Sequence, residues 1–94
     1  MGGKLPTACF TFEHLLDLLE EQDGKCAVTG KEFTFGGNYL GTNISIDRID
    51  SNEPYSAGNV RLVCAAVNYM KGRMNDNELV DWCLDIVKGA GSWK

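Results

Sequence analysis

The chain lacks any long apolar segment. No run approaches the roughly 20 apolar residues that a membrane-spanning helix needs. The first eleven residues, 1–11, have neither a basic start nor an apolar stretch of signal-peptide length. Both absences argue against membrane association, and they predict an intracellular protein.

Basic residues are also scarce, and the 94 residues carry a net charge of −4. Broad, nonspecific adhesion to nucleic acid is therefore not expected, because that affinity comes mainly from neutralised phosphates. However, Arg48, Arg61, Lys71 and Arg73 all fall in the middle of the chain, between two acidic segments. A local basic surface remains compatible with the acidic total.

Cysteine is present but does not form a dense framework. Cys9, Cys26, Cys64 and Cys83 are spread along the chain, unlike the paired cysteines of small secreted domains, which favours free thiols. Cys83 is expected in the core. At 94 residues and 44% apolar content, the chain should form one small domain with a marginal core.

The N-terminal half predicts a helix and then irregular chain. Residues 1–10 form a loose entry to a core of residues 11–88. Thr11 is a good N-cap, and apolar residues at helical spacing predict an amphipathic helix over 12–23 that Gly24 stops. Two short extended pieces around a turn should occupy 26–35, and a glycine- and asparagine-rich loop 36–43.

The C-terminal half predicts two strands and two helices. Strands at 43–46 and 60–63 flank a polar loop at 50–59, a short helix follows from Cys64 to Gly72, and a last helix begins near Asn75 or Asp76. Residues 89–94 read as a frayed tail. The predicted class is α+β. The core is expected to include the apolar stripes of the flanking helices, among them Leu15, Leu19, Val80 and Ile86, with Trp82 as a further candidate.

Three short motifs carry the chemical information. They are Asp47-Arg48-Ile49-Asp50, the strand that begins Gly58-Asn59 and ends at Cys64, and Asn68-Tyr69-Met70-Lys71-Gly72. In order and spacing this stretch resembles the HNH endonucleases of the His-Me-finger, or ββα-metal, group, in the variant with Asp-Arg-Ile-Asp found in small phage-type proteins. Residues 22–30 resemble the lead-in of the same family more weakly.

The resemblance implies a DNA-cleaving site. Asp47 and Asn68 would hold one Mg²⁺ or Mn²⁺, ions that prefer oxygen ligands and that stabilise the charge developing on a scissile phosphate. Asn59 would orient the catalytic base and steady the loop. Three cations would contact phosphates: Arg61, Lys71 and Arg73.

The chain departs from the family at the base. The family has histidine where Arg48 stands, and a guanidinium with a pKa above about 12 cannot accept a proton from water. Asp50 is a substitute base, or bulk water supplies hydroxide, while Arg48 clamps the phosphate. His14, the only histidine, lies beside Glu13 and Asp17 on the polar side of the first helix and is expected at a solvated surface.

A second departure concerns zinc. Many HNH domains are held by two Cys-x-x-Cys pairs, but here Cys26 and Cys64 each lack the partner, since Thr29 and Val67 stand in its place. Two thiols are too few for a closed tetrahedral site. Structural zinc is therefore not expected, and both thiols should be buried as small apolar groups.

Three functions remain open on the sequence alone. The first is an HNH-like metal-dependent nuclease with an altered base, which the retained pair Asp47 and Asn68 favours. The second is a catalytically silent module that binds nucleic acid through Arg48 and Lys71. The third, which the net charge of −4 favours, is a small phage-type effector that binds a protein partner. Tyr55 and Tyr69 flank the site and either stack on bases or support the loop and helix. A homodimer would enlarge the marginal core, although no residue demands it.

Overall fold

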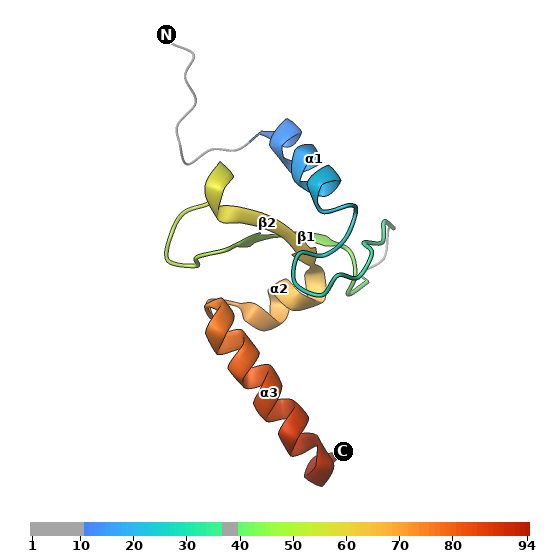
Figure 1. Cartoon of the computed structure of the whole chain (residues 1–94), viewed down its shortest axis with the longest axis vertical. Helices are drawn as coiled ribbons and strands as arrows, with labels where there is room; N and C mark the ends of the chain where they lie inside the picture. The colour runs from blue at the N-terminus through green and yellow to red at the C-terminus, as the bar shows by residue number, and fades with distance from the viewer. Residues whose placement is uncertain (1–10, 37–39) are drawn as a thin grey trace.

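The computed structural model describes residues 11–36 and 40–94, and it has the predicted α+β class (Figure 1). The loose entry at 1–10 and part of the loop predicted at 36–43 lie outside the described residues. The elements follow in the order α1 (Phe12–Glu21), β1 (Ile44–Arg48), the 3₁₀ turn η1 (Ala57–Asn59), β2 (Val60–Cys64), α2 (Ala65–Lys71) and α3 (Asp76–Trp93).

The centre of the fold is an antiparallel hairpin of β1 and β2. Its register places Ile46 opposite Leu62 and Asp47 opposite Arg61. Because side chains alternate between the faces of a strand, the first pair lies on one face and the second pair on the other. One face of the hairpin is therefore apolar, and the other carries opposite charges.

Helix α1 covers the apolar face. The Thr11 hydroxyl caps its first turn by accepting a hydrogen bond from the backbone N–H of His14 at 3.1 Å. Leu15, Leu18 and Leu19 are partly buried against the core, so the predicted contribution of the α1 stripe is confirmed. The helix ends at Glu21, two residues before the predicted Asp23, and the chain then turns through Gly24 with a φ of +69°.

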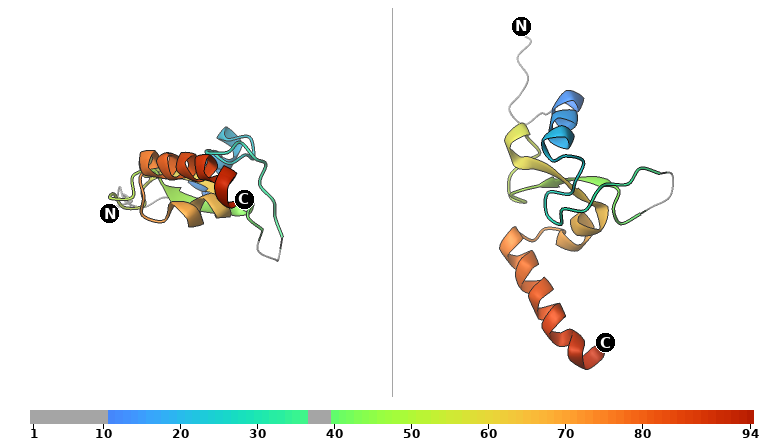
Figure 2. Two further views of the ribbon diagram at one scale, coloured as in Figure 1. Left: turned by 90° about the horizontal axis from the view of Figure 1, so that it is seen from below. Right: turned by 45° about the vertical axis from the view of Figure 1, so that its right-hand side comes forward.

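Helix α2 covers the charged face and completes the ββα unit (Figure 2). Its Asn68 and Lys71 lie one turn apart and meet successive parts of β1, at Ser45 and Asp47. The helix stops at Gly72, whose φ of +52° and ψ of −119° suit a residue without a side chain. Strand β2 and helix α2 contribute most of the buried apolar residues, with Val63 fully buried.

The segment after α1 is held by single bridges. The two extended pieces predicted over 26–35 are reduced to isolated pairings of Lys25 with Glu32 and of Thr34 with Asn43. Gln22 ties this region to β2, because its side-chain amide donates to the Leu62 carbonyl at 2.8 Å and accepts from the Leu62 N–H at 3.1 Å. Gln22 thereby provides hydrogen-bond partners for the N–H and the carbonyl of Leu62, which point away from β1.

Helix α3 is longer than the sequence predicts. A capping box between Asn75 and Glu78 starts it, and the predicted tail at 89–94 is wrong, since the helix continues to Trp93. Gly89 lowers helix propensity but does not break the ladder, and the Trp93 indole lies over it.

Helix α3 also contradicts part of the predicted core. Leu79 is buried, but Val80, Ile86 and Trp82 are each more than half exposed, and Cys83 is exposed. The physical reason is that α3 extends away from the hairpin beyond α2, so most of its apolar stripe meets no other element (Figures 1 and 2). Over residues 11–36 and 40–94, no helix is both long enough and apolar enough to cross a membrane.

The Gln22 clamp gives a stability prediction. Replacing Gln22 with alanine leaves the Leu62 N–H without its acceptor, so the free energy of unfolding should fall by about 1 to 3 kcal/mol. Urea unfolding followed by circular dichroism measures the change. Glu21→Ala, at the exposed neighbouring position, is the control and should change stability by less than about 0.5 kcal/mol. Equal effects of the two substitutions would contradict the clamp.

Candidate functional site

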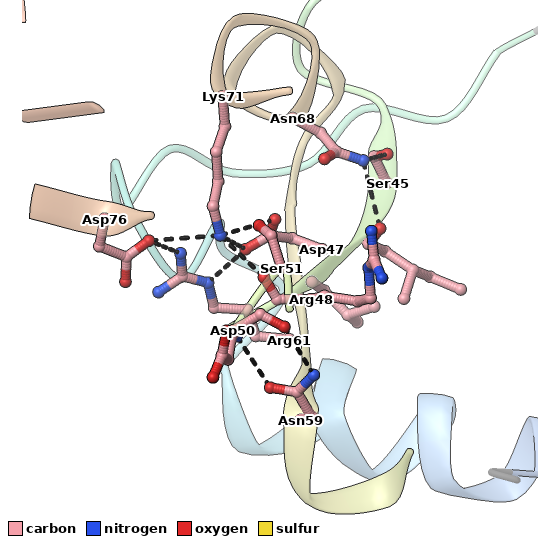
Figure 3. Close-up of polar contacts among 12 residues, drawn as sticks. Ser45, Asp47, Arg48, Asp50, Ser51, Asn59, Arg61, Asn68, Lys71 and Asp76 are labelled. Carbon is pink, nitrogen blue, oxygen red and sulfur yellow. Dashed lines mark hydrogen bonds and ion pairs between the residues drawn. The ribbon is translucent and has the colours of Figure 1, made fainter. Parts of the chain in front are cut away.

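Asp47 stands at the end of the charged face of the hairpin. Its side chain is 5% exposed, and its Oδ2 accepts a hydrogen bond from Nε of Arg61, the residue opposite in the register, at 2.8 Å (Figure 3). A carboxylate so deeply buried must be paired, because desolvation of an isolated charge costs several kcal/mol. The cross-strand pairing therefore fixes its first partner.

The second partner is a buried lysine. Lys71 reaches down from the end of α2 with a side chain that is 0% exposed, and its Nζ lies 3.1 and 3.0 Å from the two carboxylate oxygens of Asp47. The same ammonium donates to the Arg48 carbonyl at 2.8 Å. The family resemblance assigns Lys71 to a phosphate contact. In the structure its ammonium is instead buried against Asp47.

Asp76, the first residue of α3, completes the cluster. Its Oδ1 accepts from a terminal nitrogen of Arg61 at 2.7 Å and lies 3.4 Å from Nζ of Lys71. The hydrogen bond from Arg61 and the nearby positive charges lower the pKa of Asp76 below its usual value of 3.8. Burial opposes the charged form of Arg61, but its two carboxylate partners outweigh burial and raise its pKa.

These four residues, which we call the ionic cluster, join four elements. Asp47 comes from β1, Arg61 from β2 and Lys71 from α2, while Asp76 begins α3 (Figure 3). Two cations face two carboxylates, so the cluster has no net charge at neutral pH. Nothing in the sequence pattern pointed to Asp76, since its role depends on how the turn at 72–75 places the start of α3.

The arrangement around Asp47 and Asn68 does not fit a divalent cation. Both oxygens of Asp47 are already held by positive groups, and a metal ion beside Lys71 and Arg61 would be repelled. Asn68 directs its amide N–H groups to the Ser45 hydroxyl at 2.6 Å and the Ile46 carbonyl at 3.2 Å. Within the described ranges, no group of three or more acidic, histidine or cysteine side chains is arranged to hold a metal ion.

Arg48 points into the loop between the strands instead of toward Asp47. Its guanidinium lies 5.1 Å from the centre of the Tyr55 ring and donates to the Glu53 carbonyl at 3.2 Å. Among the residues that the structure describes, no carboxylate lies within ion-pair distance of it. Arg48 is therefore a positioned cation whose charge is not neutralised by a direct partner.

Asn59 braces the loop against which the Arg48 side chain lies. Its side-chain oxygen accepts from the Asp50 N–H at 2.8 Å, and its amide nitrogen is within hydrogen-bond distance of the carbonyls of Asp50, Glu53 and Pro54, at 3.0 to 3.3 Å. The side chain of Asp50 accepts from the Asn52 N–H at 2.9 Å. Asn59 thus has the loop-steadying geometry expected of it, while Asp50 serves the turn.

The remaining candidates lie apart from the ionic cluster. Arg73 is exposed just after α2 and makes no ion pair within the described part of the chain. His14 is half-buried, and its Nε2 lies 3.0 Å from the Ala57 carbonyl, so it connects α1 to η1. It is less solvated than its neighbours in sequence suggest. Tyr69, on α2, is 85% exposed.

Cys26 and Cys64 are buried together, as expected for thiols that act as small core groups. The sulfur of Cys26 accepts from the Cys64 N–H at 3.2 Å. Burial alone would raise the pKa of Cys26, but hydrogen bonds from Thr29 and from the backbone outweigh it and lower that pKa to about 7. Burial raises the pKa of Cys64.

Comparison with family models, with curated proteins and with solved structures gives no match for this chain. The resemblance to HNH endonucleases therefore rests on the three motifs and on the ββα arrangement alone.

The ionic cluster predicts strong energetic coupling. Lys71→Met should lower the free energy of unfolding by about 3 kcal/mol or more, because it removes one of two cations from a buried carboxylate. Asp47→Asn should lower the free energy of unfolding less in the Lys71→Met background than in the wild type, and the difference should be about 1 kcal/mol or more. Urea denaturation of the two single variants and the double variant measures the coupling. Lys31→Met, at an exposed lysine, is the matched control, and an additive double variant would refute the coupling.

Asp76 predicts an acid-dependent loss of stability. Its pKa is lower in the folded chain than its usual value of 3.8, so the unfolded chain binds more protons in the acid range. This contribution is present at neutral pH and is lost as the pH falls below about 4. The free energy of unfolding of Asp76→Asn should therefore depend less steeply on pH there than that of the wild type. Asp17→Asn, at an exposed position of α1, should leave the slope unchanged, and an unchanged slope in Asp76→Asn would contradict the assignment.

Proposed function

We propose that this domain is a non-cleaving, HNH-like module that binds nucleic acid, with DNA as its ligand. The proposal rests on two neighbouring features of the site. The ionic cluster is neutral and closed, and Arg48 beside it has no carboxylate partner in residues 11–36 and 40–94. The first makes metal-assisted hydrolysis at Asp47 unfavourable. The second leaves a cation held ready for a phosphate.

Arg48 is suited to a phosphate or a base. Arg48 ends β1, and the loop that its side chain contacts is braced by Asn59, so little conformational entropy is lost when a ligand binds. A guanidinium donates two parallel hydrogen bonds to a phosphate. The stacked Tyr55 is 47% exposed, and its ring offers a surface on which an unpaired base could stack.

The charge distribution limits the expected affinity. Arg61 and Lys71 are committed to the ionic cluster, which leaves Arg48 and Arg73 as the cations from the middle of the chain that can meet phosphates. About two phosphate contacts give a slope of roughly −2 for log K against log salt on duplex DNA. Binding should therefore be weak and local, which is consistent with the net charge of −4.

A metal-dependent nuclease is the second candidate. It is favoured by the position of Asp47 at a strand end beside the α2 residue Asn68, within a ββα unit. For this function Lys71 would have to leave Asp47 before a metal ion entered. Arg48 could not serve as the base, so the proton would have to pass to bulk water or to Asp50.

The binding proposal predicts a specific effect of Arg48. Fluorescence anisotropy with labelled single-stranded and duplex DNA should show that Arg48→Gln weakens binding several-fold and reduces the salt slope by about 1. Lys94→Gln removes the same charge at the far end of α3 and is the matched control (Figure 1). Equal losses in the two variants would mean that only overall charge matters, and would contradict a site at Arg48.

A nicking assay on supercoiled plasmid separates the two candidates. With Mg²⁺ or Mn²⁺ present, the wild-type chain should leave the plasmid intact. Metal-dependent nicking that disappears in Asp47→Ala would instead establish the nuclease. The Asp47→Ala protein must first be shown to be folded by circular dichroism, because Asp47 also holds the ionic cluster together.

A further inference from the structure

The largest unexplained feature of the molecule is the apolar surface of α3. Six of its large apolar side chains are between 52 and 72% exposed, namely Val80, Trp82, Leu84, Ile86, Val87 and Trp93. Two grooves run beside the helix, one of about 390 Å³ that includes Trp82 and Ile86, and one of about 260 Å³ that includes Leu84 and Val87. Small soluble domains rarely leave such a continuous patch uncovered.

The distribution of residues around α3 shows that the patch is a single face. At 100° per residue, the apolar side chains occupy a continuous arc of roughly 200°, centred near Cys83. The polar residues fill the opposite side, with Asp81, Asp85 and Ser92 in its middle. A surface helix that packs only against its own domain needs an apolar stripe about half as wide.

We propose that α3 is a homodimerisation helix, and that the α3 helices of two copies pack antiparallel along this face. The exposed area suits a second copy. At roughly 100 Å² for each aliphatic side chain and 200 Å² for each tryptophan, the six residues expose on the order of 500 Å² per chain. Two copies would therefore remove at most on the order of 1,000 Å² of apolar surface, which is close to the lower limit for a specific interface before its polar rim is counted.

The charges along α3 select the antiparallel orientation. The first ten residues of the helix hold Asp76, Glu78, Asp81 and Asp85, whereas Lys88 and the C-cap Lys94 lie toward its end. A parallel pair would place these acidic ends side by side, whereas an antiparallel pair sets each acidic half against the basic half of the other copy.

Sedimentation equilibrium of the 94-residue chain tests the proposal. Across micromolar concentrations the wild type should approach twice the monomer mass of 10.3 kDa. Ile86→Asp, which places a charge on the apolar face, should remain helical by circular dichroism and sediment as a monomer. Ser92→Asp adds the same charge to the same helix on the opposite side and should remain dimeric. A wild-type chain that is monomeric at every concentration, or an Ile86→Asp dimer, would overturn the proposal.

Discussion

The buried ammonium of Lys71 against the carboxylate of Asp47 is the contact on which the other parts of this molecule depend. Neither side chain has access to water that would compensate for losing the other. Such a pair adds little net stability compared with apolar residues of the same shape, but breaking it is costly. Its effect is therefore to permit only one arrangement of α2 on the hairpin, the one in which Nζ of Lys71 reaches both oxygens of Asp47 and the Arg48 carbonyl.

The contact between Lys71 and Asp47 also bears on whether this site could hold a catalytic metal ion. A ββα unit brings a strand-end acid beneath a helix, and that acid can be neutralised by a metal ion or by a cation of the protein itself. Here the oxygens of Asp47, the Arg48 carbonyl and Asp76 surround an ammonium, which supplies one positive charge and no exchangeable water. A bound metal ion activates water, and a lysine ammonium does not. The contact that stabilises the fold thus works against hydrolysis at this position.

The sequence predicted the helices and strands well, but not which charged side chains contact one another. Helix α1, the hairpin and α2 follow from periodicity, capping residues and turn residues, so their positions were correct to within one or two residues at most ends. The family resemblance also implied that Asn59 steadies the loop. The pairing of Asp47 with Lys71 was not predicted, since it depends on the rotation of α2 over the hairpin, which the motif spacing does not fix. The motif alone cannot distinguish a lysine that faces phosphates from one that faces an aspartate.

The errors on α3 have a different physical origin. An apolar stripe in a sequence shows that a helix has a face to bury, but not where the covering surface lies. Val80, Cys83 and Ile86 were assigned to the core on that stripe, yet α3 leaves the domain after Leu79. The start of α3 is fixed by Asp76 in the ionic cluster, which directs the rest of the helix away from the sheet. A chain of this size has few apolar residues to spare, so a second copy that covers α3 would supply the burial that the single domain lacks.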